Sequence, residues 1–152
     1  MRVVAFDVGE RRIGVAVSDA TRTLARPESV LRPTSLESNG LQLAVDEVAR
    51  LKSEEDGVAA IVVGLPRRLD GTDTELTARV SRFASELGRL TRLPIVLQDE
   101  RLTSREAESR LAVTEKDWRV RKRRLDAAAA AIILQDYLDA RHESRVPAAP
   151  DV

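Results

Sequence analysis

The chain has 152 residues, 43% hydrophobic and 33% charged, and its 25 basic residues balance 25 acidic ones. This composition is typical of one globular domain and excludes a collagen-like or wholly unfolded chain. Cysteine is absent and His142 is the only histidine, which excludes a disulfide framework, a thiol nucleophile and a multi-histidine metal site.

Apolar runs in the first part of the chain predict three strands. Residues 3–6 and 13–17 are β-branched runs, the first closed by Asp7, and residues 28–31 form a weaker third run. The connections are too short for the crossover that parallel pairing requires, so these strands must be antiparallel neighbours. The period then changes, because apolar residues over 41–51 recur at helical spacing.

The rest of the chain alternates strands with helices. The sequence predicts a strand over 58–63, then a helix opened by a capping box of Thr72 and Glu75, and then a strand over 95–98. A helix over 104–113 follows, opened by a capping box of Thr103 and Glu106. The chain is then expected to form a mobile polar loop over 114–124, a helix over 125–142 and a disordered tail over 144–152. This order predicts one α/β domain over 1–143 with the ribonuclease H-like fold. Its sheet has five strands, three antiparallel and then two parallel, with helices on its flanks.

Acidic residues stand where the first and last strands end and where the final helix begins. Asp7 closes the first strand and Asp99 and Glu100 close the last, at the sheet edge where open α/β sheets bind ligands. Asp126 is the one charge on the apolar stripe of the final helix, and a charge facing a core is costly unless it is paired or metal-bound. The structural alternatives are a solvated turn residue for Asp7 and a helix-dipole contact for Asp126.

Carboxylates that converge without histidine or cysteine form an oxygen-only site, which suits Mg²⁺ or Mn²⁺. Two such ions are the usual apparatus for hydrolysing phosphodiester bonds. The acids therefore predict a nuclease-type metal site at this edge of the sheet.

Glycines and basic residues near these acids point to a phosphate-bearing substrate. Gly9 permits close approach of the backbone to a ligand, Arg11 and Arg12 follow in the same turn, and Arg67 and Arg68 lie in the loop after the middle strand. Most residues of the segment 119–124 are basic, namely Arg119, Arg121, Lys122, Arg123 and Arg124. This basic segment predicts a clamp on a nucleic-acid backbone, with salt-sensitive binding, although a solvated charged surface is the alternative.

Four segments resemble, in order, the blocks of the YqgF (RuvX) family: FDVGERRIGVAVSD at 6–19, IVVGLPRRLDGT at 61–72, DERLTS at 99–104 and RVRKRRLDAAAAAIILQDYL at 119–138. The resemblance implies a bacterial, cytoplasmic, ribonuclease H-like nuclease that matures the 5′ end of pre-16S ribosomal RNA or, in another description, resolves Holliday junctions. It also implies that Asp7, Glu100 and Asp126 are the catalytic, metal-binding acids. Asp99 is a further candidate ligand, although neighbours on a strand point to opposite faces. We expect the side-chain oxygens of the three acids within roughly 4–7 Å of one another.

The chain is therefore expected to be a metal-dependent endonuclease that uses Mg²⁺ or Mn²⁺ and acts on structured nucleic acid, with pre-rRNA favoured over branched DNA. A cytoplasmic location follows from the absence of a signal-peptide pattern and of an apolar run long enough to span a membrane. Both a monomer and a homodimer are compatible with the sequence. Three alternatives stay open: a Holliday junction resolvase, half of a sugar-kinase or actin-type phosphate-binding fold, and a non-catalytic ribosome- or transcription-associated binding factor.

Overall fold

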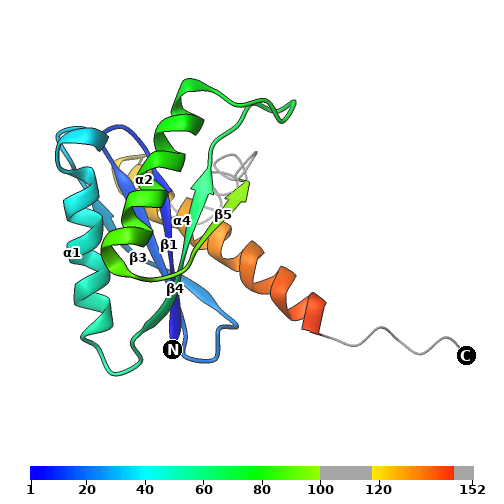
Figure 1. Cartoon of the computed structure of the whole chain (residues 1–152). Coiled ribbons are helices and arrows are strands. Elements are labelled where there is room, and N and C mark those ends of the chain that lie inside the picture. Colours follow the sequence, from blue (N-terminus) through cyan, green and yellow to red (C-terminus); the bar gives the residue numbers. More distant parts are fainter. Residues whose placement is uncertain (100–117, 146–152) are drawn as a thin grey trace, which may run out of the picture.

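The computed structural model describes residues 1–99 and 118–145, and for residues 118–126 and 143–145 it describes the backbone alone. A five-stranded sheet runs through the centre of this structure (Figure 1). Its strands are β1 (Arg2–Val8), β2 (Ile13–Ser18), β3 (Ala25–Leu31), β4 (Val58–Leu65) and β5 (Ile95–Asp99), in the spatial order β3-β2-β1-β4-β5. Strands β1, β2 and β3 pair antiparallel, whereas β4 and β5 run parallel to β1. The predicted mixed α/β sheet is confirmed.

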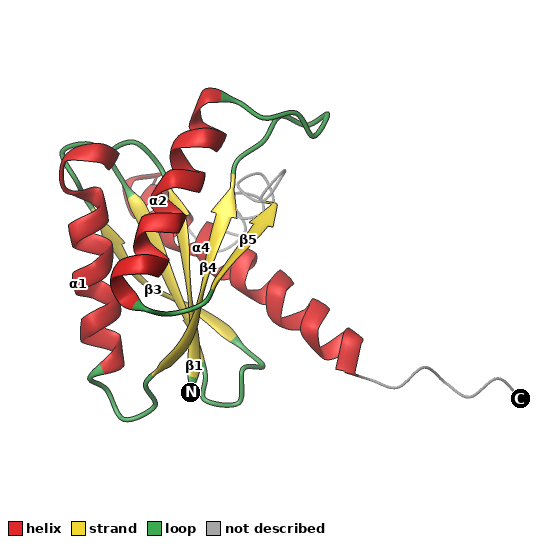
Figure 2. Cartoon of the chain, in the orientation of Figure 1, coloured by secondary structure: helices red, strands yellow, loops and turns green. Residues whose placement is uncertain are grey.

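Helices cover both faces of the sheet (Figure 2). Helices α1 (Leu41–Lys52) and α2 (Glu75–Thr91) pack on one face, and α4 (Trp118–Arg145) packs on the other, mainly over β2, β3 and β1. A short π-helix, η1 (Leu36–Gly40), leads into α1 and was not predicted. Among the described helices, none is both long enough and apolar enough to cross a membrane.

Alternation along β1 supplies side chains to two separate cores. Val4 and Phe6 pack in the core formed with α1 and α2, whereas Val3 and Ala5 pack against α4. Successive residues of a strand point to opposite faces, so one strand can build both cores. The four residues Val3, Val4, Ala5 and Phe6 are all buried, which explains why β1 appears in the sequence as a continuous apolar run.

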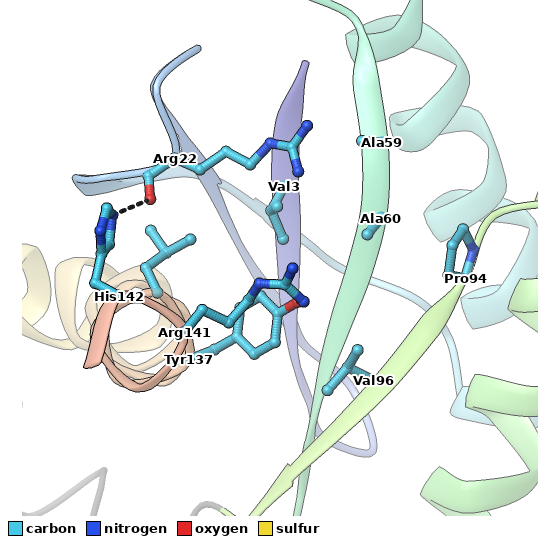
Figure 3. A pocket seen from close by; sticks show the side chains of 10 residues that line it. Val3, Arg22, Ala59, Ala60, Pro94, Val96, Tyr137, Arg141 and His142 are labelled. Atoms are coloured by element: carbon cyan, nitrogen blue, oxygen red, sulfur yellow. Dashed lines mark hydrogen bonds between the residues drawn. The ribbon is translucent and has the colours of Figure 1, made fainter. Parts of the chain in front are cut away.

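The direction of α4 follows from its contacts with β1. The apolar stripe predicted for this helix is buried on the sheet and includes Ala130, Ile133, Leu134, Tyr137 and Leu138. Tyr137 lies beside Val3 at the start of β1 (Figure 3). The C-terminal half of α4 therefore lies over the start of β1, and its N-terminal half extends toward the end of β1.

The predicted starts of two helices, α2 and α4, are wrong. Helix α2 is capped by a reciprocal pair of Thr74 and Thr77 instead of Thr72 and Glu75. The reason is that residues 67–73 form a small hairpin, in which the Thr72 carbonyl accepts a hydrogen bond from the Arg68 amide at 3.0 Å. The predicted loop over 114–124 is helical from Trp118 onward, because arginine and lysine are good helix formers and adjoin an alanine-rich helix.

Strand β3 is longer than predicted and begins at Ala25, since Pro27 is tolerated on an edge strand. The predicted helix over 104–113, its capping box, and residues 114–117 of the predicted loop lie outside the described residues. Helix α4 includes residues 144 and 145, whereas residues 146–152 of the expected tail also lie outside.

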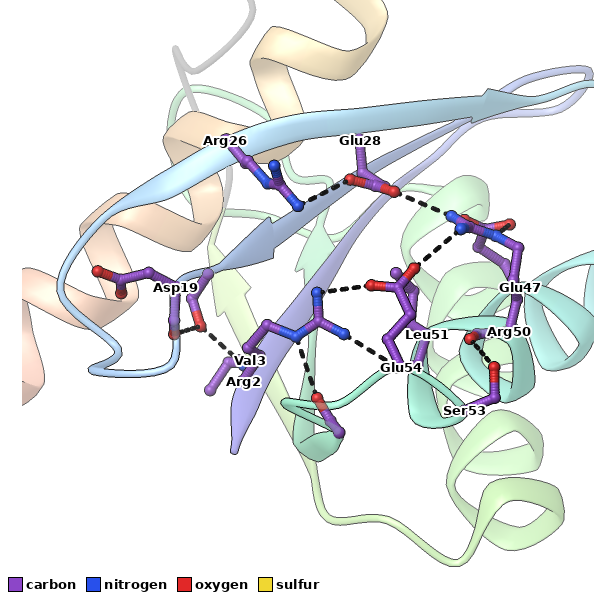
Figure 4. A network of polar contacts seen from close by, with 12 residues as sticks. Arg2, Val3, Asp19, Arg26, Glu28, Glu47, Arg50, Leu51, Ser53 and Glu54 are labelled. Carbon is purple, nitrogen blue, oxygen red and sulfur yellow. Dashed lines mark hydrogen bonds and ion pairs between the residues drawn. The ribbon is translucent and has the colours of Figure 1, made fainter.

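A buried arginine fastens the start of β1 to the end of α1 (Figure 4). The side chain of Arg2 donates hydrogen bonds to the carbonyls of Leu51 at 3.0 Å and Gly57 at 3.2 Å. Its Nη1 also lies 3.1 Å from Oε2 of Glu54. Arg2 is only 4% exposed, so these partners replace the water that its charge would otherwise need.

We expect Arg2→Met to lower the free energy of unfolding by about 2 kcal/mol, because two carbonyls lose their donor. Arg26→Met is the matched control, since the Arg26 side chain is 67% exposed and lies 3.7 Å from Glu28. The control should cost less than about 0.5 kcal/mol. Urea unfolding measures both values, and equal values would show that the Arg2 network contributes no stability.

Candidate functional site

Asp7 lies at the end of β1, on the sheet face that α4 covers. It stands two residues beyond Ala5, which packs against α4, and strand alternation places both on one face. Asp7 is half-buried and pairs across the sheet with Gly14 of β2. On the other side, the register that pairs Phe6 with Val63 brings Gly64 of β4 beside it. Both cross-strand neighbours of this carboxylate therefore lack side chains.

The turn after Asp7 is tight and is tied to α2. The Gly9 amide donates to the Arg12 carbonyl at 2.8 Å, and a Cβ at position 9 would lie 3.0 Å from that same oxygen. Glu10 in this turn pairs with Arg79 of α2 at 2.5 Å. Arg79 also pairs with Glu37 of η1 at 2.5 Å, and this hydrogen bond lowers the pKa of the Glu37 carboxyl. Arg79 thus links the turn that follows Asp7 to α2 and η1.

Asp99 lies on the opposite face of the sheet from Asp7. Ile95 of β5 packs with the α1–α2 core and Val96 packs with the α4 core, so alternation puts Asp99 on the α1–α2 face. Nη1 of Arg67 lies 3.8 Å from Oδ2 of Asp99, and its Nε donates to Oδ1 of Asp73 at 3.0 Å. Arg67 is therefore shared between the carboxylates of Asp99 and Asp73.

The other two predicted acids are described less fully. Asp126 lies in the N-terminal part of α4, four residues before Ala130 and therefore on the same side of the helix as the buried stripe. Its side chain lies outside the described residues, as does all of Glu100. The distances predicted among the three acids consequently stay predictions.

The predicted basic residues fall into two groups. Arg11, Arg12 and Arg68 are exposed in the turns that follow β1 and β4. The basic segment, residues 119–124, forms the first turns of α4 directly before Asp126, and its side chains lie outside the described residues. The basic segment is therefore part of the same continuous helix as the apolar stripe that packs on the sheet, instead of part of a loop.

Of the acids predicted for the metal site, the structure describes the side chains of Asp7 and Asp99, which lie on opposite faces of the sheet. No group of three histidine, cysteine, aspartate or glutamate side chains within the described part of the structure is arranged to hold a metal ion. The half-buried Asp7 carboxylate, with glycines on both neighbouring strands, is the type of oxygen donor that Mg²⁺ and Mn²⁺ prefer. The Asp7 carboxylate therefore fits a Mg²⁺ or Mn²⁺ ion.

Sequence reasoning missed the residues that surround Asp7. Gly14 was not singled out, although a glycine inside a strand often marks close approach of a ligand or another chain segment. Arg79 was also missed, because its partners Glu10 and Glu37 lie far from it in the sequence. No local pattern signals that contact.

Known proteins are similar to this chain over nearly its whole length. A protein from Anaeromyxobacter sp. (strain Fw109-5) named "Putative pre-16S rRNA nuclease" is 43% identical over 142 residues, which are 93% of this chain and 99% of that one. A protein of the same name from Chloroflexus aggregans is 40% identical over 139 residues, 91% of this chain and 94% of that one.

Among solved structures, RuvC of T. thermophilus in complex with a Holliday junction substrate matches with a TM-score of 0.52 and 18% identity. The match covers 93% of this chain and 96% of RuvC and confirms the ribonuclease H-like fold. A family model described as "RuvX: Holliday junction resolvase" matches residues 1–140. With that match and these relatives, which align over nearly the whole chain, the protein belongs to the RuvX family.

Proposed function

We propose that this protein is a metal-dependent endonuclease in which Asp7, Glu100 and Asp126 act together to hydrolyse a phosphodiester bond of structured nucleic acid. The observation that carries the proposal is the position of Asp7. It is a half-buried carboxylate with glycines as cross-strand neighbours, on the face over which the helix that contains Asp126 is packed.

Helix and strand dimensions support the convergence of Asp7 with Asp126. From Val3 to Asp7 the strand rises about 13 Å. From Tyr137, which lies beside Val3, back to Asp126 the helix rises about 16 Å. The two lengths are similar, and both lead from the neighbouring residues Val3 and Tyr137 toward the end of β1. Both acids therefore fall near the same edge of the sheet.

The register of the sheet brings the end of β5 to that edge as well. Gly64 pairs with Gln98, so Asp7, Gly64 and Gln98 form one row across β1, β4 and β5. Neighbouring strands are about 4.8 Å apart, which puts Gln98 about 10 Å from Asp7. Glu100 follows β5 directly in the sequence, and we therefore include its carboxylate in the proposed site.

The chemistry divides between the acids and the basic residues around them. Divalent ions held by these acids would supply an activated water and would stabilise the leaving oxygen. Asp7 provides a fixed carboxylate, and the glycines beside it leave space for a phosphate. Arg11 and Arg12, in the turn that Glu10 ties to Arg79, orient the substrate's phosphates at that edge.

We propose precursor 16S ribosomal RNA as the substrate, because the relatives at about 40% identity carry that name. A four-way DNA junction is the second candidate, since the matching family model is described as a Holliday junction resolvase. Both substrates offer the same phosphodiester chemistry. They differ in the 2′-hydroxyl groups and in the shape of the duplex.

Cleavage of both substrates side by side tests the proposal. A labelled precursor RNA that spans the 5′ end of 16S rRNA and a labelled DNA junction are each incubated with Mg²⁺, with Mn²⁺ and with EDTA. We expect metal-dependent cleavage of the RNA near the mature end. Cleavage of the junction alone would overturn the choice of substrate, and cleavage of neither in any metal would overturn the proposed activity.

The basic segment at the start of α4 gives a further prediction. Replacing Arg121, Lys122 and Arg123 with alanine should weaken nucleic-acid binding at all sequences and keep the helix, because alanine is the best helix former. The slope of log K against log salt should fall by about 0.9 per lost contact on duplex and about 0.7 on single strands.

The control for this prediction removes the same charge elsewhere. Arg26, Lys52 and Arg89 are exposed and lie on β3, α1 and α2. Alanine at these three positions should leave the salt slope within error of the wild-type value. Equal slopes for the two triple variants would show that the basic segment is a solvated surface.

A further inference from the structure

A basic pocket lies at the end of the sheet opposite to Asp7. The pocket has a volume of about 260 Å³ and lies between the C-terminal half of α4, the β2–β3 turn and the starts of β1 and β4. Two arginines and the single histidine line it, namely Arg22, Arg141 and His142. Among the described residues that line the pocket, none is acidic. Its lining therefore favours an anion.

Arg22 is held in place at some conformational cost. Its φ is 57°, in the left-handed region that residues other than glycine and asparagine rarely adopt. The side-chain Nε donates to the Met1 carbonyl at 2.8 Å, the Arg22 amide donates to the Asp19 carbonyl at 3.1 Å, and the His142 ring contacts the Arg22 carbonyl at 3.2 Å. These contacts hold Arg22 in a backbone conformation that costs free energy.

The β2–β3 turn that carries Arg22 is itself well ordered by Asp19. The Asp19 carboxylate accepts hydrogen bonds from the amides of Thr23 at 2.8 Å and Leu24 at 3.2 Å, and the first of these contributes most to lowering the pKa of Asp19. The guanidinium of Arg22 is thus carried by a turn with a fixed backbone.

Arg141 approaches the same space from α4. Its Nη1 donates to the Tyr137 hydroxyl at 3.0 Å, and its guanidinium lies 5.6 Å from the centre of the Tyr137 ring. Figure 3 shows the guanidiniums of Arg22 and Arg141 both extending toward the strands. Each guanidinium presents five N–H donors in a planar fork, a geometry that pairs with the oxygens of a phosphate.

The floor of the pocket is apolar and made of small side chains. Ala60 of β4 and Val96 of β5 are half-buried, and Pro94 at the start of β5 is exposed. An apolar surface beside two guanidiniums matches a nucleotide, whose phosphate pairs with arginine and whose base packs on apolar surface.

We propose that this pocket binds one nucleotide of a nucleic-acid strand at a distance from the carboxylate site, an inference that rests on the proposed nuclease function. Val3 in the pocket and Asp7 are four residues apart on β1 and lie on the same face of the sheet, about 13 Å apart. A strand that occupies both places would be held at its cleavage site and at a second phosphate. The pocket therefore favours longer single-stranded segments as substrates.

The test measures binding of a fluorescent single-stranded 12-nucleotide RNA and of a dinucleotide, in EDTA to prevent cleavage. Arg22→Asn removes the guanidinium and keeps a residue that tolerates the left-handed backbone, and Arg141→Gln removes the second one. We expect each variant to weaken binding of the 12-nucleotide RNA about tenfold, the loss of one charge-assisted contact. The dinucleotide is long enough to fill the pocket alone, so its weaker binding should fall by a similar factor in both variants.

Arg92→Asn is the matched control. Arg92 has the same left-handed backbone, with φ of 58°, and does not line the pocket. Arg22→Lys keeps the positive charge and should retain most of the RNA affinity that Arg22→Asn loses. This comparison distinguishes loss of the contact with the phosphate from damage to the β2–β3 turn. The melting temperature of each variant monitors folding, and Arg141→Gln lies on an exposed position of α4 that a helix tolerates.

Wild-type affinity in both pocket variants, or an equal loss in Arg92→Asn, would overturn the proposal. Binding of free AMP as tight as that of the 12-nucleotide RNA would also overturn it, because the pocket would then serve a free nucleotide. The proposed nuclease function is tested separately by single-turnover cleavage at saturating protein. Metal-dependent cleavage by the wild-type protein, together with wild-type RNA affinity in both pocket variants, would refute the pocket and leave the nuclease function standing.

Discussion

Asp7→Asn is expected to reduce the rate of substrate cleavage at least about a thousandfold, equivalent to about 4 kcal/mol of transition-state stabilisation. The substitution keeps the size of the side chain and removes the charge that would hold a divalent ion. The fold should be unaffected, because Asp7 is only half-buried and its cross-strand neighbours are glycines. Single-turnover cleavage at saturating protein measures the rate without a contribution from binding.

Asp46→Asn is the control for this experiment. Asp46 is exposed on α1, where its Oδ1 accepts a hydrogen bond from Gln42 at 2.8 Å. The control should cleave at the wild-type rate. Asp126→Asn should also abolish cleavage and should not lower the melting temperature in EDTA, since clustered carboxylates repel one another without metal. A variant at position 126 that melts well below wild type in EDTA would show that Asp126 has a structural role.

The second large effect concerns the docking of α4. Leu134→Ala should lower the free energy of unfolding by about 3 kcal/mol, because Leu134 is fully buried between α4 and the sheet and its removal leaves a cavity. Cleavage should fall as well in the folded variant, since α4 carries Asp126. Urea unfolding and cleavage at low temperature measure the two effects.

Leu90→Ala is the matched control for Leu134→Ala. Leu90 lies on α2 and is 46% exposed, so its truncation should cost less than about 0.5 kcal/mol. Equal losses in the two variants would mean that α4 is not fixed by this contact. If Leu134→Ala were destabilised but cleaved at the wild-type rate, the packing of α4 at this contact would not be needed for cleavage.

Most of the fold could be predicted from the sequence because its signals are local. The continuous apolar run of β1 and the helical stripe from Ala130 to Leu138 each identify one element and the face that it buries. The short connections fix the antiparallel pairing of β1, β2 and β3. The start of α4 was predicted wrongly because the basic segment has no apolar period, although its residues form helices readily.

The candidate site could be predicted only in part, because its assembly depends on contacts between distant segments. The position of Asp7 at a strand end follows from the sequence, and its face follows from alternation once the packing of α4 is known. The pairing of Arg67 with Asp99, and of Arg79 with Glu10, depends on tertiary distances that no local pattern records.

The carboxylate site is tested most directly by anomalous diffraction from crystals soaked in Mn²⁺. We expect anomalous peaks about 2.1 Å from a carboxylate oxygen of Asp7 and from one of Asp126, as ligands of shared ions require. Both peaks should disappear in crystals of Asp7→Asn. Crystals that show Mn²⁺ elsewhere and none at Asp7, from a protein whose cleavage EDTA abolishes, would contradict a metal site formed by these acids.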